Sequence, residues 1–325
     1  MKKIFVVLFI YFSIIGIAQE PIYNLNINNI HLINFASEKE NNFGAFVDNS
    51  YEYYSNNKQM NSTNLFIYHK IFSSFNARIN AGINAEYNYL NNSNNYSNID
   101  FVVDYKLLLG NDFFLKTAIN LGARNNNIDY SNLQSRYTFD EVQNTNISFN
   151  ETNFNLGFSS IISYKKQEFG FSVNHLNKAE LPMKDDRIPI KYTAYIRNRY
   201  AGNKSERNIF YSTITYSYQD SYFLNPTDMS YYYDMLNYFG INLDWDYERI
   251  FYSGIAYKYL SNKNNLFSLN FGFVLFMNTF NIGIKYSPSI MQSYDNKSIT
   301  QFHQMSIYLK GFYKATVNGG SVRSL

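Results

Sequence analysis

The chain has 325 residues, 16% of them charged, a formal net charge of +3 and no cysteine. The small and scattered positive charge gives no indication of nucleic-acid binding, and the lack of cysteine excludes disulfides, thiolate metal sites, cysteine nucleophiles and a lipid anchor on an N-terminal cysteine. A mean hydropathy of −0.34 excludes a helical membrane protein but not a membrane β-barrel, because each spanning strand of a barrel is half polar.

The N-terminus has the three parts of a secretory signal peptide. Met1-Lys2-Lys3 is basic, Ile4 to Ile15 is apolar, and small residues precede a cleavage site that we place after Ala18. The apolar run is too short for a membrane-spanning helix, which needs about 20 apolar residues. We therefore expect residues 1–18 to be a signal peptide and residues 19–42, which are irregular and polar, to be an N-terminal periplasmic segment.

The segment from Phe75 to Tyr89 alternates at every position between an apolar side chain and a polar residue or glycine. A strict period of two is typical of a β-strand with one apolar and one polar face. Strands of soluble domains have about 5 or 6 residues, whereas a tilted strand that crosses a bilayer needs about 9 to 11. Aromatic residues close both ends of the apolar face, as in outer-membrane barrels. The pattern predicts a barrel strand with Ile79 and Ile83 toward lipid.

Similar alternating runs extend along the rest of the chain. They cover residues 43–54, 64–71, 98–109, 113–124, 153–164, 169–175, 190–199, 209–218, 231–245, 250–259, 266–277, 280–286 and 301–313. With residues 75–89 they predict about fourteen strands, an even number that is typical of bacterial barrels. No linker rich in Pro, Gly or Ser interrupts them. We expect one all-β domain, an antiparallel transmembrane β-barrel over residues 43–313, followed by a C-terminal tail over residues 314–325.

The composition allows one other class of β-protein. The chain contains 32 Tyr and 29 Phe, which suit strands and membrane interfaces because the ring is buried while the tyrosine hydroxyl stays hydrated. A soluble β-protein rich in Tyr and Asn would share this composition. The lengths of the connections are therefore an independent test.

The predicted connections alternate between short and long. Short ones are residues 72–74, 110–112, 165–168, 246–249 and 278–279, and long ones are residues 55–63, 90–97, 125–152, 176–189, 219–230 and 287–300. Outer-membrane barrels have short periplasmic turns and longer external loops. Residues 200–208 and 261–265 fit the alternation less well, because their lengths are intermediate. The pattern predicts a bacterial outer-membrane location with both termini in the periplasm.

Residues suited to catalysis or metal binding are few. His31, His69, His175 and His303 lie far apart, and none has a second ligand at a metal-binding spacing. The acidic run 244–248 lacks the glycine and distal glutamate of an EF-hand, and we interpret it as a solvated turn. The sequence predicts no catalytic, cofactor-binding or metal-binding residue. An outer-membrane hydrolase would need Ser, His and a polar residue to meet at the rim.

Charged residues on the polar faces of the predicted strands are candidates for the barrel lumen. They are Arg78, Glu86, Asp100, Asp104, Lys106, Lys116 and Arg124, and further along the chain Lys191, Arg197, Lys258, Lys285 and Lys310. Mixed charges of this kind either pair across strands or line a water-filled pore. The sequence leaves both open, a self-satisfied interior and a solute-selective pore.

Several short motifs resemble the PorP/SprF family of outer-membrane proteins, which serve type IX secretion and gliding in Bacteroidetes. The clearest runs from Asn153 to Phe158 and continues from Phe169 to Asn177, where the family has a G-x-S-x-x-H-L-N-like run before a variable loop. Residues 120–133, with Gly122, resemble the segment before the long central loop. Residues 301–307 resemble the closing strand, with Gln304 in place of the usual glutamate. Residues 29–36 resemble the family's N-P-L-L-I-N-P-A opening without its two prolines.

The resemblance implies a divergent, non-enzymatic outer-membrane barrel that works with the secretion apparatus. Its expected partners are outer-membrane lipid, type IX secretion components and secreted adhesin-like proteins that it helps to reach or stay on the cell surface. The resemblance marks His175, Leu176 and Asn177 as a candidate partner-binding motif. It implies no cofactor, nucleic acid or small-molecule substrate. A passive or solute-selective porin and an outer-membrane hydrolase are the alternatives.

Overall fold

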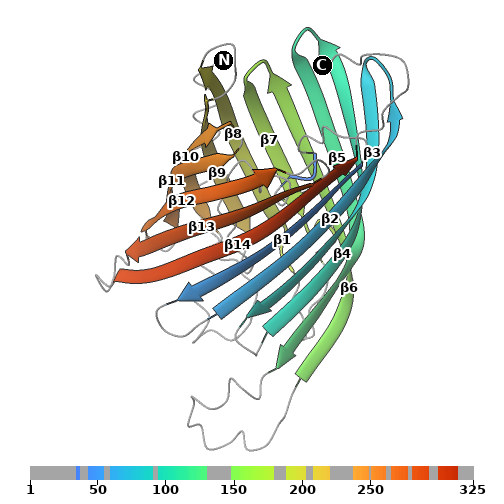
Figure 1. Ribbon diagram of the computed structural model, residues 1–325. Coiled ribbons are helices and arrows are strands. Elements are labelled where there is room, and N and C mark those ends of the chain that lie inside the picture. The colour runs from blue at the N-terminus through green and yellow to red at the C-terminus, as the bar shows by residue number, and fades with distance from the viewer. Residues whose placement is uncertain are drawn as a thin grey trace, which may run out of the picture.

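The computed structural model describes residues 34–36, 43–54, 59–90, 94–129, 148–178, 188–202, 208–219, 237–248, 250–260, 265–276, 280–292 and 299–313. Within these residues the chain forms one closed antiparallel β-barrel of fourteen tilted strands (Figure 1). The predicted fold class is therefore confirmed. β1 begins at Phe43 and β14 ends at Tyr313, the limits that were predicted for the barrel.

The strands follow one another around the barrel in the order of the sequence. They are β1 (Phe43–Tyr54), β2 (Gln59–Ser73), β3 (Ala77–Leu90), β4 (Asn94–Gly110), β5 (Phe113–Asp129), β6 (Ser148–Tyr164), β7 (Gln167–Asn174), β8 (Lys191–Gly202), β9 (Asn208–Gln219), β10 (Tyr238–Tyr247), β11 (Phe251–Leu260), β12 (Asn265–Phe276), β13 (Phe280–Gln292) and β14 (Ile299–Tyr313). β1 pairs with β14 and closes the sheet, so no strand is left at an edge.

The two ends of the barrel differ in their connections. One end, called the turn end below, has tight turns such as Asn111–Asp112 and Lys165–Lys166, in which Asp112 and Lys165 have positive φ angles. β1 begins and β14 ends at this turn end. The opposite end, called the loop end, has the longest connections, among them residues 130–147 and 175–190. Two of its connections are shorter than predicted, because only residues 55–58 join β1 to β2 and only residues 91–93 join β3 to β4.

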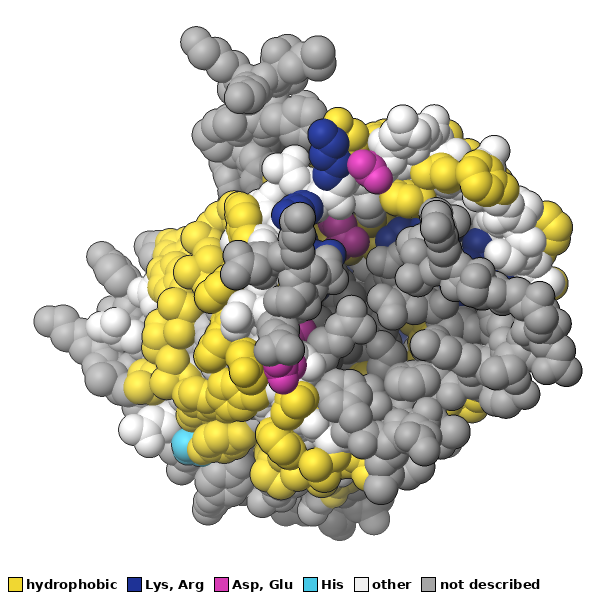
Figure 2. Space-filling view, turned by 45° about the horizontal axis from the view of Figure 1, so that its top comes forward, with side chains coloured by type: hydrophobic (Ala, Val, Ile, Leu, Met, Phe, Trp, Pro, Cys, Tyr) yellow, Lys and Arg dark blue, Asp and Glu magenta, His cyan; other side chains and the backbone are white. Residues whose placement is uncertain are grey.

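Side chains alternate between the outside and the inside of the wall. Ile83 and Ile119 are exposed on the outside, while Asn80, Asn84 and Asn88 of β3 are buried inside. Apolar side chains cover the outer wall, and charged side chains gather toward the hollow of the barrel (Figure 2). This is the arrangement that a lipid-facing barrel needs, because outward side chains meet hydrocarbon. Among the described residues no helix is long and apolar enough to span a membrane.

Several predicted strand boundaries are wrong because the strands continue past the membrane at the loop end. β4, β5 and β6 each have 17 residues, more than the about 9 to 11 that cross a bilayer. The ends of the predicted loop 125–152 belong to β5 and β6, where Asn125 Nδ2 donates to Thr152 Oγ1 over 2.9 Å. The part of a strand that extends into water carries polar side chains on both of its faces. The alternation of apolar and polar residues that marks a strand therefore disappears there.

Two other predictions are corrected in the second half of the chain. The interpretation of residues 244–248 as a solvated turn is wrong for most of its length, because β10 runs to Tyr247 and buries Asp244 and Asp246 inside the barrel. β13 extends to Gln292, so the predicted loop 287–300 is shorter than expected. Residues 231–236 of the predicted tenth strand lie outside the described residues.

The turn end of β9–β11 carries an aromatic cluster on the outer wall. The Trp245 ring lies 6.3 Å from Phe210, 6.0 Å from Tyr247 and 6.1 Å from Phe251 between ring centroids. Trp245 Nε1 also donates to Asn208 Oδ1 over 3.2 Å. Amphipathic rings of this kind sit at the level of the lipid headgroups, so the cluster marks the membrane boundary at the turn end.

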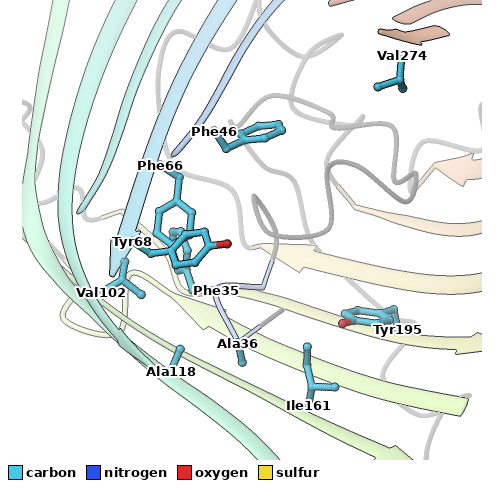
Figure 3. Close-up of a cluster of buried hydrophobic side chains, with 10 residues drawn as sticks. All are labelled: Phe35, Ala36, Phe46, Phe66, Tyr68, Val102, Ala118, Ile161, Tyr195 and Val274. Carbon is cyan, nitrogen blue, oxygen red and sulfur yellow. The ribbon is translucent and has the colours of Figure 1, made fainter. Parts of the chain in front are cut away.

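The interior contains apolar as well as polar side chains. Ten buried residues form one apolar cluster: Phe35, Ala36, Phe46, Phe66, Tyr68, Val102, Ala118, Ile161, Tyr195 and Val274 (Figure 3). The inner face is therefore not polar throughout. A signal was present in the sequence, because runs such as Leu65-Phe66-Ile67-Tyr68 are apolar on both faces of the strand.

Tyrosine rings lie directly over glycines of the neighbouring strand on the inner face. A Cβ atom added at Gly170 of β7 would fall on the ring of Tyr195 in β8, its register partner. Gly44 lies under Tyr68 and Gly272 under Tyr252 in the same way. Glycine is needed at these positions because a side chain there would displace a packed ring.

Gly170→Ala is therefore expected to lower the free energy of unfolding by about 1 to 3 kcal/mol, the usual cost of overpacking. Urea titration of the barrel in lipid vesicles measures it. Gly110→Ala is the matched control, because a Cβ there has no atom within 4 Å. Equal stability of the two variants would show that the Tyr195 ring moves aside without cost.

Candidate functional site in the barrel interior

A chain of hydrogen bonds connects a buried arginine to a buried aspartate at the loop-end half of the lumen. Arg124 Nη1 lies 3.2 Å from His175 Nε2, and His175 Nδ1 lies 2.9 Å from Asn155 Oδ1. Asn155 Nδ2 in turn donates to Asp100 Oδ1 over 3.0 Å. Because arginine can only donate, Nε2 is the acceptor and Nδ1 carries the proton. The imidazole thus connects the guanidinium of Arg124 to the Asn155 amide that binds Asp100.

Further bonds hold both ends of this chain. Arg124 Nε donates to Asn126 Oδ1 over 3.1 Å, and its guanidinium lies 4.0 Å from the centroid of the Tyr96 ring. Asn98 Nδ2 donates to Asp100 Oδ2 over 2.5 Å. Asp100 is 1% exposed and Arg124 is 3% exposed. Both charges are therefore solvated by protein amides and an aromatic face instead of by water.

Asparagine also takes part in other charge contacts of β3 and β4. Glu86 accepts from Asn88 Nδ2 over 2.7 Å and from the Tyr96 hydroxyl over 3.0 Å. Arg78 Nε donates to Asn80 Oδ1 over 2.8 Å, and Asn80 Nδ2 donates to Asp104 over 2.6 Å. An amide placed between a cation and an anion satisfies both, because it accepts with its oxygen and donates with its nitrogen.

The structure places all seven predicted lumen charges on the inner side of the wall. Asp100, Asp104, Lys116 and Arg124 are buried, and Arg78, Glu86 and Lys106 are half-buried. It links Arg124 to Asp100 through His175 and Asn155, and Arg78 to Asp104 through Asn80. Lys106 instead lies over the ring of Phe114, 4.5 Å from its centroid.

The opposite wall carries charges of its own. Arg197 of β8 lies 3.8 Å from Glu168 of β7, and Lys258 Nζ lies 4.7 Å from the centroid of the Tyr238 ring. Lys285 of β13 is buried, as is Asp244 of β10. Sequence reasoning assigned Arg197, Lys258 and Lys285 to the interior; it included Asp244 in the predicted strand 231–245 but interpreted the acidic run 244–248 as solvated, and so did not assign Asp244 to the interior.

The motif His175–Asn177 ends β7 and holds the longer β6 in place. His175 has a positive φ angle of 59°, which turns the chain away from the wall. Leu176 N then donates to Leu156 O over 2.9 Å, while Leu156 N donates to Asn177 Oδ1 over 3.2 Å. Asn177 Nδ2 also donates to Phe154 O over 2.5 Å. The Asn177 side chain thus takes the place of the next strand residue against β6.

The three residues of this motif have different positions. His175 is buried in the hydrogen-bonded chain to Arg124, Asn177 binds the β6 backbone, and Leu176 is exposed. Asn155, which sequence reasoning quoted in a motif but did not single out, is the central link between His175 and Asp100. Its inward position two residues before Gly157 follows from the period of two, but its partners do not.

Three residues of the predicted N-terminal segment lie inside the barrel. Asn34 is 0% exposed, and its Nδ2 lies 3.1 Å from Ser160 O of β6 and 3.2 Å from Phe171 O of β7. Its Oδ1 accepts from Ala36 N over 3.0 Å. The Phe35 ring packs 6.0 Å from Phe66 between centroids (Figure 3). The rest of segment 19–42 lies outside the described residues.

The described residues give no indication of a catalytic or metal centre. No group of three or more His, Asp or Glu side chains in them is placed to hold a metal ion. His175 contacts Arg124 and Asn155, and His303 stacks on Tyr286 with its Nδ1 2.8 Å from the tyrosine hydroxyl. His31 and the acidic pair Asp185-Asp186 lie outside the described residues.

A closed barrel with an apolar outer wall and a hydrogen-bonded polar interior defines the chain as an outer-membrane β-barrel protein. Within that class, the model of the family described as "Type IX secretion system membrane protein PorP/SprF" matches residues 17–262. The chain therefore belongs to the PorP/SprF family, and the resemblance in its motifs is confirmed. No curated protein matches its sequence.

Solved structures support the fold at low sequence identity. The monoaromatic hydrocarbon channel CymD aligns with a TM-score of 0.52 and 10% identity, over 93% of this chain and 99% of its own. The toluene transporter TbuX of Ralstonia pickettii aligns with a TM-score of 0.52 and 8% identity, over 86% and 91%. Both the family and these structures are membrane barrels. At such identities the likeness concerns the fold alone.

Proposed function

We propose that this protein is a non-enzymatic partner of the type IX secretion machinery, which binds or anchors secreted proteins such as gliding adhesins at the cell surface. The observation that carries the proposal is the family match over residues 17–262. The interior supports it, because its described charges are held by amides, aromatic rings and each other rather than arranged around a reacting centre.

Deletion of the gene tests this proposal. We expect secreted or surface-attached adhesin-like proteins to be lost from the cell surface, and the tagged barrel to co-purify with one of them or with secretion components. Complementation with the wild-type gene is the control. An unchanged set of secreted and surface proteins after deletion would contradict the proposal.

The motif His175–Asn177 is proposed to shape the partner-facing surface. Its hydrogen bonds fix where β7 stops and where the connection to β8 leaves the wall; Leu176 and Asn177 are both exposed, and the Asn177 side chain is bound to the β6 backbone. In this role His175 and Asn177 are positioning residues, while Leu176 is the member available for contact. Leu176→Ser should lower partner recovery in the same co-purification without changing barrel stability.

The turn end is proposed to face the periplasm, together with both termini. Tight turns on the periplasmic side are the rule for outer-membrane barrels. Cysteines introduced one at a time test this orientation, because the chain has no cysteine of its own that would also be labelled. A membrane-impermeant maleimide should label Asn150→Cys at the loop end of intact cells, and Asn111→Cys at the turn end only after the outer membrane is opened. The reverse pattern would invert the orientation.

A porin is the second candidate, favoured by the many polar and charged side chains on the inner wall. It would pass solutes without a protein partner. Conductance of the purified wild-type barrel in a planar bilayer separates the two functions. A stable open channel would favour the porin.

A further inference from the structure

The apolar cluster inside the barrel forms a collar near the turn end. Its wall members come mainly from one side of the barrel, among them Phe46 of β1, Phe66 of β2, Val102 of β4 and Ile161 of β6. Val274 of β12, a strand that lies opposite β5 in the ring of strands, also belongs to the cluster but stands apart from the other side chains (Figure 3). Apolar side chains facing a water-filled lumen would remain hydrated, so a collar of this kind is stable only when something covers it.

The chain itself supplies part of the cover. Phe35 and Ala36 are buried members of the same cluster, and the Phe35 ring lies 6.0 Å from Phe66. Both residues belong to a segment that precedes β1 and is not part of the wall. The wall side chains form an apolar surface, and the Phe35 ring packs against it. Such packing of an aromatic ring is a binding contact.

Asn34 fixes this contact to the wall. Its amide nitrogen donates to carbonyl oxygens of two neighbouring strands, Ser160 O in β6 and Phe171 O in β7. Its amide oxygen accepts from Ala36 N and closes a tight turn around Phe35. The amide thus uses both its oxygen and its nitrogen at a fully buried position, as a specific site requires.

We propose that residues Asn34–Ala36 are a plug, that the collar is its binding site, and that this contact keeps the barrel closed to ions. The hydrogen bonds of Asn34 hold the plug to β6 and β7, and the Phe35 ring is its apolar anchor. This inference concerns the state of the lumen and stands whether or not the secretion partner proposed above is found. It predicts that the PorP/SprF-type barrel is opened by withdrawing its own N-terminal segment.

Planar-bilayer recording of the full chain tests the plug. We expect the wild-type barrel to show no stable open channel. The double variant Asn34→Ala with Phe35→Ala should shift the ratio of open to closed barrels by about 100-fold, the loss expected when a buried aromatic anchor is truncated. A wild-type barrel that conducts steadily, or a folded double variant that stays closed, would overturn the proposal.

Thiol labelling gives a second readout that does not depend on current. Ile161→Cys replaces a collar residue that is 1% exposed, and Ile162→Cys replaces its outward neighbour, which is 42% exposed. A small water-soluble maleimide should label the collar cysteine about 100-fold faster when Asn34 and Phe35 are alanine. The rate at the outward cysteine should not change. If the collar cysteine of the double variant is labelled faster than in the wild type but the variant carries no current, residues Asn34–Ala36 do not close the barrel to ions.

Folding of each variant is checked by its heat-dependent mobility on gels. If the double variant does not fold, Asn34→Leu replaces it, because leucine keeps the bulk of the side chain and removes both donated hydrogen bonds. Its collar cysteine should then be labelled faster than in the wild type. An unchanged labelling rate in that variant would show that the contact of Asn34 with β6 and β7 does not hold the segment.

Discussion

Replacement of Ile119 by arginine is expected to cost about 2 to 4 kcal/mol of folding free energy in lipid, because it places a charge in the hydrocarbon. Ile119 lies near the middle of β5, is 50% exposed and points away from the buried Ala118 and Asn120 on either side. Denaturant titration in vesicles, followed by tryptophan fluorescence of Trp245, measures the cost. The assignment of this face to lipid depends on the result.

The control for this substitution must be an exposed residue outside the membrane. Asn111 in the turn between β4 and β5 is such a residue, and Asn111→Arg should cost no more than about 1 kcal/mol. Asn80→Arg, on the inner face, is a poor control because Asn80 is buried and bonds both Arg78 and Asp104. Equal losses at positions 119 and 111 would refute the assignment.

Removal of Arg124 is expected to have a comparable effect for a different reason. Arg124→Met removes a buried guanidinium that donates to His175 Nε2, so the imidazole that leads on through Asn155 to Asp100 loses its charged donor. Leaving a buried acceptor without its donor in this way costs about 1 to 3 kcal/mol. Unfolding in vesicles measures the loss, and barrel closure is followed by gel mobility.

A double-mutant cycle separates the charge from the packing. Asp100→Asn removes the negative charge and keeps the shape of the side chain, so the pair Arg124→Met with Asp100→Asn should be less destabilised than the sum of the two single variants. Coupling of about 0.5 to 3 kcal/mol is usual for groups in one network. Additive losses would show that the relay through His175 and Asn155 carries no coupling.

The sequence alone predicted the strands whose outer face is in lipid. The run from Phe75 to Tyr89 alternates without a break because each outward residue must be apolar and each inward one can be polar. The prediction was wrong at the loop end, at residues 125–129 and 148–152, because strands that leave the membrane no longer carry an apolar face. The interpretation of residues 244–248 as a solvated turn was also wrong, because a dense acidic run has the composition of a turn while β10 continues to Tyr247.

The sequence assigned the charges of the candidate site to the inner wall but did not predict their partners. Arg124 contacts His175 from a strand two places away, and Asn155 on the strand between them reaches both His175 and Asp100. A period of two says which side of the sheet a residue faces, and the family motif says that His175 recurs at this point. Neither fixes the register that brings β4, β5, β6 and the end of β7 together in one hydrogen-bonded chain.

The sequence by itself therefore determined an outer-membrane barrel, its two faces, its strand order and its family, because membrane hydrocarbon imposes a local pattern on every strand. Only the tertiary structure decided that the lumen has an apolar collar near the turn end and that Asn34–Ala36 occupies it. Contacts across a closed barrel depend on the stagger of all fourteen strands together. No single segment of the sequence encodes that geometry.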